Sequence, residues 1–180
     1  MIYFVLTQNG SLSCGNGDKV IDVEDLSVDH AGFLICSQCL LGEAVRYDGC
    51  SQTSEKLLNF AVINNLLLIG VCPEVLGGLH IPRTPCEITS VQPLIVSDRN
   101  GKDQTNAFLI GAEKVLDLFS KLPQSLPITF VLKECSPSCG VNLRYDGTFS
   151  GRKVSGQGVL IQLFKSRRIP IKVWSSIEFD

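Results

Sequence analysis

Three cysteine-bearing loops each follow a short apolar stretch of the sequence. The stretches at 33–36, 66–71 and 128–132 lead into Cys36-Ser37-Gln38-Cys39, Cys72-Pro73-Glu74 and Cys135-Ser136-Pro137-Ser138-Cys139-Gly140. Apolar runs of this length, bounded by turn-forming residues, are typical of strands buried on both faces. Ligands of open α/β sheets bind beyond the carboxyl ends of the strands. If the three strands are parallel neighbours, Cys39, Cys72 and Cys139 meet at one edge of the sheet.

Three thiolates at one edge favour an iron–sulfur cluster over a structural zinc ion. A structural zinc site needs four ligands. Cys36 is a poor fourth ligand, because side chains of a strand alternate between faces. Three thiolates suit a cubane cluster with one iron left open, which is a Lewis acid with affinity for sulfur. Two other interpretations stay open: the cysteines are small buried hydrophobic residues, or Cys36 and Cys39 form a redox dithiol.

Glu74 lies two residues after Cys72, at the same predicted strand end. A partly desolvated carboxyl group there could act as a general acid or base. The alternative is a structural glutamate that caps the following helix or pairs with Arg83. Other chemistries are poorly served: the sequence has no H-E-x-x-H, Walker A, complete G-x-G-x-x-G or G-x-S-x-G motif, and its two histidines, His30 and His80, stand alone.

The chain has 180 residues, eight cysteines and a formal net charge of −2. A chain of this length is typical of one domain that buries about 70% of its unfolded surface, which excludes disorder as its main state. The weak charge provides no field that attracts nucleic acid. The longest uncharged stretch, Leu57–Pro73, is short and interrupted by asparagines, so no membrane span is expected. The start lacks a basic segment and a cleavage site, so a reducing, cytoplasmic setting is expected.

Strands alternate with helices along most of the chain. The apolar pattern predicts helices over 54–63, 103–122 and 158–165, further strands over 3–6 and 169–174, and a loop with a small strand pair over 77–98. This alternation predicts a single three-layer, Rossmann-like α/β domain over residues 32–180, with a mostly parallel sheet. Residues 1–31 form an N-terminal extension whose structure the pattern does not define.

The cysteine loops belong to a set of motifs that follow one another in order. They are Ser37-Gln38-Cys39-Leu40-Leu41-Gly42, Val45-Arg46-Tyr47-Asp48-Gly49, Cys72-Pro73-Glu74-Val75-Leu76-Gly77-Gly78-Leu79, Gly101-Lys102-Asp103-Gln104-Thr105, Leu132-Lys133-Glu134-Cys135-Ser136-Pro137-Ser138-Cys139-Gly140 and Tyr145-Asp146-Gly147-Thr148-Phe149-Ser150-Gly151. Over residues 34–175 the sequence resembles the thiouracil desulfidase family, formerly catalogued as a domain of unknown function. The sequence departs from the family pattern at Gln38, Gln104 and Cys135, the last where arginine is usual.

The resemblance implies a 4Fe-4S cluster held by Cys39, Cys72 and Cys139, of a kind readily lost in air. It implies Glu74 and Ser136 as catalytic residues. The activity implied is the non-redox removal of sulfur from a small thiolated nucleobase such as 2-thiouracil. The alternative is a non-catalytic iron–sulfur or zinc module that senses sulfur compounds or assists tRNA thiolation.

Overall fold

The computed structural model describes residues 3–15, 20–26 and 29–179, and its largest sheet has seven strands in the order β11-β8-β4-β5-β1-β2-β3. These strands are β1 (Tyr3–Leu6), β2 (Leu12–Cys14), β3 (Val20–Ile21), β4 (Gly32–Ser37), β5 (Leu66–Val71), β8 (Ile128–Leu132) and β11 (Lys172–Ser175). The strands from β11 to β1 run parallel, and β2 and β3 extend the sheet in antiparallel pairing. The predicted α/β fold with a mostly parallel sheet is confirmed.

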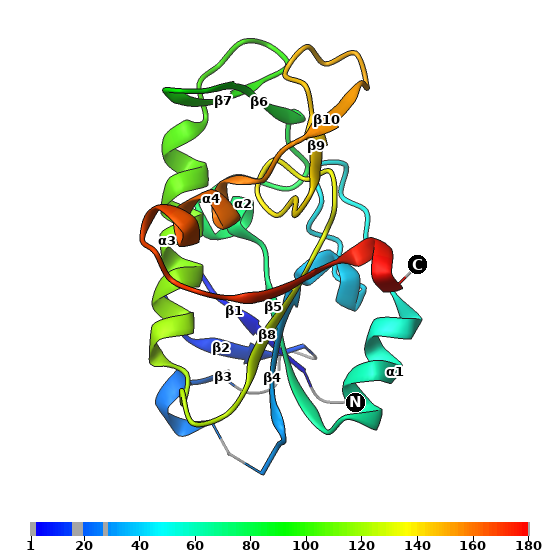
Figure 1. Cartoon of the computed structure of the whole chain (residues 1–180), viewed down its shortest axis with the longest axis vertical. Coiled ribbons are helices and arrows are strands. Elements are labelled where there is room, and N and C mark those ends of the chain that lie inside the picture. Colours follow the sequence, from blue (N-terminus) through cyan, green and yellow to red (C-terminus); the bar gives the residue numbers. More distant parts are fainter. Residues whose placement is uncertain (1–2, 16–19, 27–28, 180) are drawn as a thin grey trace.

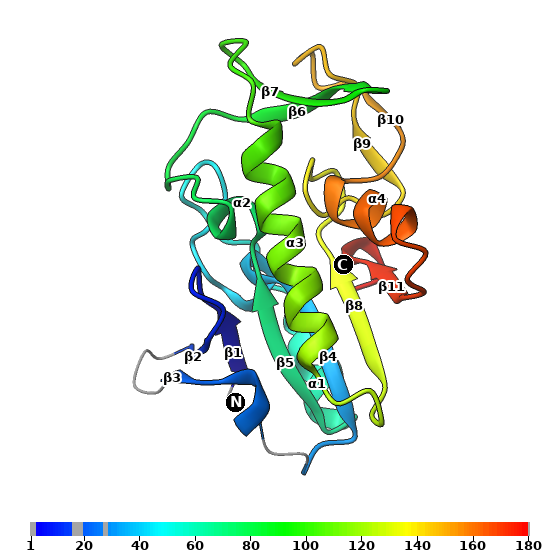
Figure 2. The ribbon, with the colours of Figure 1, turned by 90° about the vertical axis from the view of Figure 1, so that its left-hand side faces the viewer.

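Helices cover both faces of this sheet, so the domain has three layers (Figures 1 and 2). They are α1 (Glu55–Ile63), α2 (Pro73–Leu76), α3 (Thr105–Lys121) and α4 (Val159–Ser166). Side chains of the central strands alternate between the layers: Phe33 and Ile35 pack with α3 and α4, whereas Leu34 and Cys36 pack with α1. Both faces of the sheet are therefore apolar, as the continuous apolar stretches of the sequence predict.

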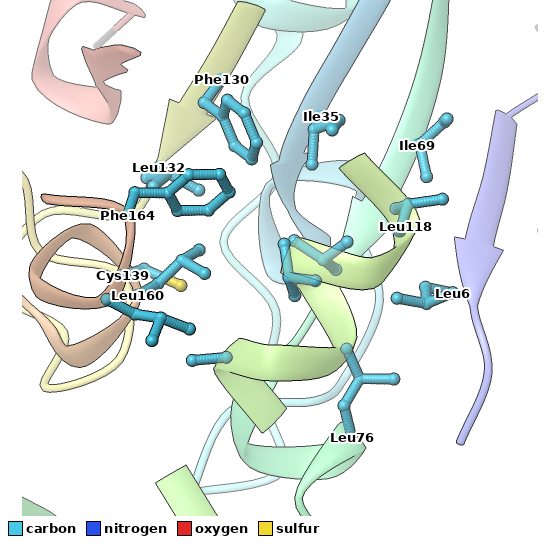
Figure 3. Close-up of a cluster of buried hydrophobic side chains, with 14 of the residues drawn as sticks. Leu6, Ile35, Ile69, Leu76, Leu118, Phe130, Leu132, Cys139, Leu160 and Phe164 are labelled. Carbon is cyan, nitrogen blue, oxygen red and sulfur yellow. The ribbon is translucent and has the colours of Figure 1, made fainter. Parts of the chain in front are cut away.

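The larger core cluster lies between the sheet and the helices α3 and α4 (Figure 3). Phe130 and Phe164 make an edge-to-face contact there, with ring centroids 5.4 Å apart. Cys139 lies beside Leu132 and Leu160 at one end of this cluster. The core thus continues up to the loop that follows β8.

The helices α1, α3 and α4 match the predicted ranges closely, whereas the single turn of α2 has no predicted counterpart. Ser54 is the N-cap of α1 and its hydroxyl accepts a hydrogen bond from the amide of Leu57. The helix predicted over 103–122 is α3, and the one predicted over 158–165 is α4. The last strand begins at Lys172, three residues later than predicted, and Pro170 just before it has no amide hydrogen for a sheet ladder.

Two antiparallel hairpins lie beyond the carboxyl ends of the central strands (Figure 2). The first pairs β6 (Cys86–Val91) with β7 (Leu94–Asp98), and the second pairs β9 (Leu143–Tyr145) with β10 (Lys153–Ser155). Glu87 joins them, because its carboxylate accepts hydrogen bonds from the amides of Gly147 and Phe149 at 2.8 and 3.1 Å. The hairpins form a cover above the edge of the sheet where the cysteine loops begin.

The N-terminal segment is part of the same domain core. β1 pairs in parallel with β5, in the register Tyr3 with Leu68 and Val5 with Gly70. Leu6, Leu12 and other apolar residues of the segment are buried in the larger cluster, including some from the 3-10 helix η1 (Val23–Asp25) and its end. Among the helices described, none combines the length and apolar character needed to cross a membrane.

Candidate active site

Three cysteines from three neighbouring strand ends line one cavity of about 430 Å³. Cys39 lies in the 3-10 helix η2 (Gln38–Leu41) directly after β4, and Cys72 is the N-cap residue of α2 after β5. Cys139 lies in the loop after β8. Because β8, β4 and β5 are adjacent and parallel, their carboxyl ends bring these residues together. The cavity size is typical of small-molecule sites.

Cys39 and Cys139 are buried and Cys72 is half-buried, and the surroundings raise the pKa of all three thiols. Burial raises the pKa of Cys39 to about 11 and that of Cys72 to about 12. Lys133 and Arg46 counteract this effect at Cys39, and the nearby Glu74 carboxylate adds to it. Burial also raises the pKa of Cys139 well above its usual value, while the Ser37 hydroxyl hydrogen-bonds its thiol and lowers it. The charge of Cys39 adds to the raised pKa of Cys72, and the charges of Cys72 and Cys39 add to that of Cys139, so the three sulfurs lie close enough to interact.

Glu74 lies in the first turn of α2 and points into the same cavity. Its Oε1 accepts a hydrogen bond of 2.7 Å from the hydroxyl of Ser138, and its Oε2 pairs with the guanidinium of Arg83. The same guanidinium also donates to the carbonyl of Val45 at 3.1 Å. The side chain of Glu74 is only 14% exposed, so the carboxylate that these two partners hold is also partly desolvated. The pairing with Arg83 that the sequence allowed as a structural role is present, and it places the carboxylate next to the cysteines.

Close contact with α3 fixes the position of α2. A Cβ on Gly111 would lie 1.7 Å from the carbonyl oxygen of Pro73, and one on Gly77 would lie 1.9 Å from that of Ala107. Only glycine allows the two backbones to approach this closely. The glycines therefore set the distance of the turn that carries Glu74 from the long helix behind it.

The two serines of the Ser136-Pro137-Ser138-Cys139 segment have different contacts. The Ser136 hydroxyl oxygen accepts hydrogen bonds from the amides of Ser138 and Cys139, both at 3.1 Å. Ser138 is only 1% exposed, and its hydroxyl donates a hydrogen bond to the Glu74 carboxylate. The structure thus brings Ser138 to the carboxylate, a contact that the sequence does not indicate. Ser136 also lines the cavity, and its own hydrogen is left to donate.

Glu134 organises the loop that carries Cys139. Its buried Oε1 accepts hydrogen bonds from the amides of Val141, Asn142 and Leu143 at 3.0, 3.0 and 2.8 Å. Its Oε2 accepts one of 2.5 Å from the Ser175 hydroxyl. Burial raises the pKa of this carboxyl, but these donors outweigh it and the pKa is lowered overall. The loop is therefore closed around one ionised side chain.

The rest of the cavity lining comes from the two hairpins and from the loops after η2, β7 and β8. It includes three aromatic residues, one cation and two further thiols; these residues are Tyr47, Cys86, Arg99, Cys135, Tyr145 and Phe149. Burial, then the carboxylates of Glu74 and Asp98, raise the pKa of Cys86 to about 12. Flat apolar rings beside polar groups suit a small heterocyclic ring.

All eight cysteines are free thiols. Cys36 is fully buried in the cluster beneath α1 and does not line the cavity, and burial raises its pKa. A redox dithiol needs an accessible thiol of low pKa, so this pair does not suit that chemistry. In residues 3–15, 20–26 and 29–179, no group of three or more histidine, cysteine or acidic side chains is arranged to hold a metal ion. In a cubane each cysteine binds a different iron, so its ligands stand farther apart than ligands that share one ion.

Fold and site together define a class: an α/β domain with three thiols and a carboxylate in one cavity at the carboxyl edge of its sheet. The sequence model of the family described as 2-thiouracil desulfurase matches residues 34–175. The chain therefore belongs to the 2-thiouracil desulfurase family. It is 37% identical over 139 residues to the uncharacterized protein YbbK of Bacillus subtilis strain 168, covering 73% of this chain and 89% of that protein. It is also similar to a solved structure of the [4Fe-4S]-dependent thiouracil desulfidase TudS, with a TM-score of 0.69, 38% identity, and coverage of 82% of this chain and 92% of TudS.

Proposed function

We propose that this protein is an iron–sulfur-dependent desulfidase that removes sulfur from a thiolated nucleobase such as 2-thiouracil. The observation that carries the proposal is the meeting of three free thiols and Glu74 in one cavity. Family membership and the name of the TudS relative support the same activity. The free state of all eight cysteines supports a reducing, cytoplasmic setting.

The donor set fits a 4Fe-4S cluster held by Cys39, Cys72 and Cys139. The three thiols have raised pKa values, so they need a bound cationic group to become thiolates at neutral pH. Lys133, whose charge favours the Cys39 thiolate, adds positive charge beside them. When bound, such a cluster would supply one iron without a cysteine ligand, which could take up a sulfur atom and polarise a C–S bond.

The reaction balances without a change of oxidation state. Water adds its oxygen to the ring carbon, the C–S bond breaks, and a carbonyl compound and sulfide are formed. In the proposal, Glu74 accepts the proton of the attacking water. Arg83 and Ser138 hold the carboxylate in place by the contacts described above. The free hydrogen of Ser136 is available to orient the ring or to relay a proton.

Anaerobic purification followed by iron and sulfide analysis tests the cofactor, and incubation with 2-thiouracil tests the activity. We expect about four irons per chain from the cubane stoichiometry, uracil as the product, and one sulfide for each uracil. A fully loaded protein that persistently releases no sulfide would favour the non-catalytic module. A protein that binds only zinc would remove the cluster from the proposal.

Changes at single cysteines test the ligand set. We expect alanine at Cys39, Cys72 or Cys139 to abolish cluster assembly, because a remaining pair of thiolates cannot hold a cubane at three corners. Cys36→Ala is the matched control, since Cys36 is a neighbouring buried thiol outside the cavity. Iron content and the visible spectrum give the result. Full iron retention in any of the first three variants would remove that residue from the set, and loss of activity in Cys36→Ala would revive the redox dithiol.

The two serines can be separated by their contacts. We expect Ser138→Ala to lower kcat by about tenfold with full cluster content, because the lost hydrogen bond is made to a charged group. Ser136→Ala removes the acceptor of two loop amides, so we expect it to lower both cluster content and kcat. Steady-state kinetics normalised to iron content distinguish the two. Equal normalised activity of Ser138→Ala and the unmodified protein would show that the contact with Glu74 has no role in turnover.

A further inference from the structure

The N-terminal hairpin, residues 3–14 with strands β1 and β2, lies outside the residues that the family's sequence model matches. Its first strand adds to the sheet next to β5, the strand that Cys72 directly follows. Val5 packs against Gly70, because a Cβ added to Gly70 would lie 3.2 Å from Cγ1 of Val5. The hairpin thus packs directly against the strand that positions one of the site cysteines.

The turn of this hairpin reaches the end of α2. The side-chain amide of Gln8 donates to the carbonyl of Val75 at 2.8 Å. The Lys114 ammonium, from α3, donates to the carbonyls of both Gln8 and Leu76, at 2.7 and 3.0 Å. These contacts satisfy carbonyls at the carboxyl end of a short helix that has few hydrogen bonds of its own. Lys114 therefore ties the hairpin to the helical turn that carries Glu74.

The first strand of the hairpin reaches a second segment of the site. The hydroxyl of Tyr3 donates to Oε1 of Glu43 at 2.5 Å, across forty positions of sequence. Glu43 follows the 3-10 helix that contains Cys39, and Val45 and Arg46 just after it line the cavity. The Tyr3 ring lies over Gly15, where an added Cβ would come within 2.2 Å of it. The tyrosine is thereby fixed between its own hairpin and residues 38–46, which we call the Cys39 segment.

We propose that the N-terminal hairpin is a positioning element of the active site, which sets α2 through Gln8 and Lys114 and the Cys39 segment through Tyr3. Its consequence for cluster uptake rests on the function proposed above. In this proposal the two segments are held in place before a cluster binds, by a part of the chain outside the matched region. Tyr3, Gln8 and Lys114 act through other residues and touch no substrate.

The first test uses Lys114→Met, which keeps the aliphatic stem and removes the ammonium. We expect the amides of Leu76 and Gly77, which bond the carbonyls of Cys72 and Pro73, to exchange with deuterium roughly tenfold faster in the cluster-free protein. Amides of β8 should exchange at their normal rate, which shows that the fold is intact. Lys114→Arg, which can still donate to both carbonyls, should restore slow exchange. Lys121→Met is the matched control, because this lysine of the same helix forms an exposed pair with Asp117.

The second test concerns cluster uptake. We expect Lys114→Met and Tyr3→Phe each to slow anaerobic cluster assembly several-fold and to alter the visible circular dichroism of the bound cluster. Glu43→Gln keeps an oxygen that can accept from Tyr3, so it should assemble its cluster at nearly the normal rate. Ser13→Ala is the control within the hairpin, since its described hydrogen bond goes to the neighbouring Cys14 carbonyl.

Unchanged exchange at Leu76 and Gly77 in Lys114→Met would overturn the part of the proposal that concerns α2. Normal assembly and spectra in Tyr3→Phe would overturn the part that concerns the Cys39 segment. Neither measurement needs turnover of thiouracil. If the unmodified protein binds a cluster but releases no sulfide, the proposed desulfidase activity fails while both tests of the hairpin can still be evaluated.

Discussion

Glu74→Gln is expected to lower the turnover of 2-thiouracil by about 10²–10⁴-fold while the cluster stays bound, the usual contribution of a positioned acid or base. The amide keeps the shape of the side chain and can still accept a hydrogen bond from Ser138, but it cannot take a proton from water. The loss should therefore fall on kcat, with a smaller change in KM. Steady-state kinetics on protein of measured iron content check this expectation.

The matched control is Glu113→Gln, which removes the same charge from an exposed ion pair between α3 and Arg167 at the end of α4. We expect its kinetics to stay within twofold of the unmodified protein. If Glu74→Gln loses iron and colour, the carboxylate has a structural role through Arg83 instead of a catalytic one. If it keeps normal turnover, the water must be activated elsewhere in the cavity.

The sequence predicts the frame of the site because that frame depends on short apolar stretches. The stretches at 66–71 and 128–132 coincide with β5 and β8, and both faces of these strands are covered. Once three such strands are parallel neighbours, the rule that ligands bind at their carboxyl ends places Cys39, Cys72 and Cys139 together. Helix ranges followed from equally local signals, such as the capping serine before α1.

The contacts within the site could not be predicted in this way, because they depend on backbone directions within loops. Ser136 and Ser138 are two positions apart in one motif, and the sequence does not distinguish them. Ser136 closes the turn by accepting two amides, and this turn is what directs Ser138 toward Glu74. Likewise, nothing local identifies Glu134 as the acceptor of three amides seven to nine positions later.

The place of the N-terminal strands was also beyond prediction from the sequence alone. The apolar stretch at 3–6 predicts a strand, but its pairing with β5 joins residues more than sixty positions apart. Such pairing is decided by which sheet edge is free after the other elements have packed, and that is a property of the whole fold. The functional consequence, contacts with Val75 and Glu43, appears only with the structure.

Glu134→Ala is expected to destabilise the cluster-free protein by about 3 kcal/mol or more, since each buried donor left without an acceptor costs about 1–3 kcal/mol. The change leaves the amides of Val141, Asn142 and Leu143 without their acceptor inside the folded protein. Urea denaturation measures the loss. We also expect the variant to assemble its cluster poorly, because the loop that presents Cys139 is no longer closed around a carboxylate.

Glu134→Gln separates the charge from the hydrogen bonds, because its carbonyl oxygen can still accept from the three amides. The folded protein lowers the pKa of Glu134 below its usual value of 4.5, so the ionised carboxylate stabilises the fold fully above that pH. The stabilisation is lost as the pH falls through the lower folded-state pKa. The difference in the free energy of unfolding between the unmodified protein and Glu134→Gln should therefore be largest at neutral pH and shrink below pH 4.5.

Subtracting the two unfolding curves at each pH removes the contributions of other carboxylates, including Asp103 and Asp146, whose pKa values are also lowered. Glu113→Gln, with its exposed ion pair, should change the free energy of unfolding by at most about 1 kcal/mol. A difference for Glu134→Gln that stays constant from neutral to acidic pH would mean that folding does not shift the pKa of this carboxyl group. Its charged and protonated forms would then stabilise the loop equally, and the loop would owe its closure to hydrogen bonding with no contribution from charge.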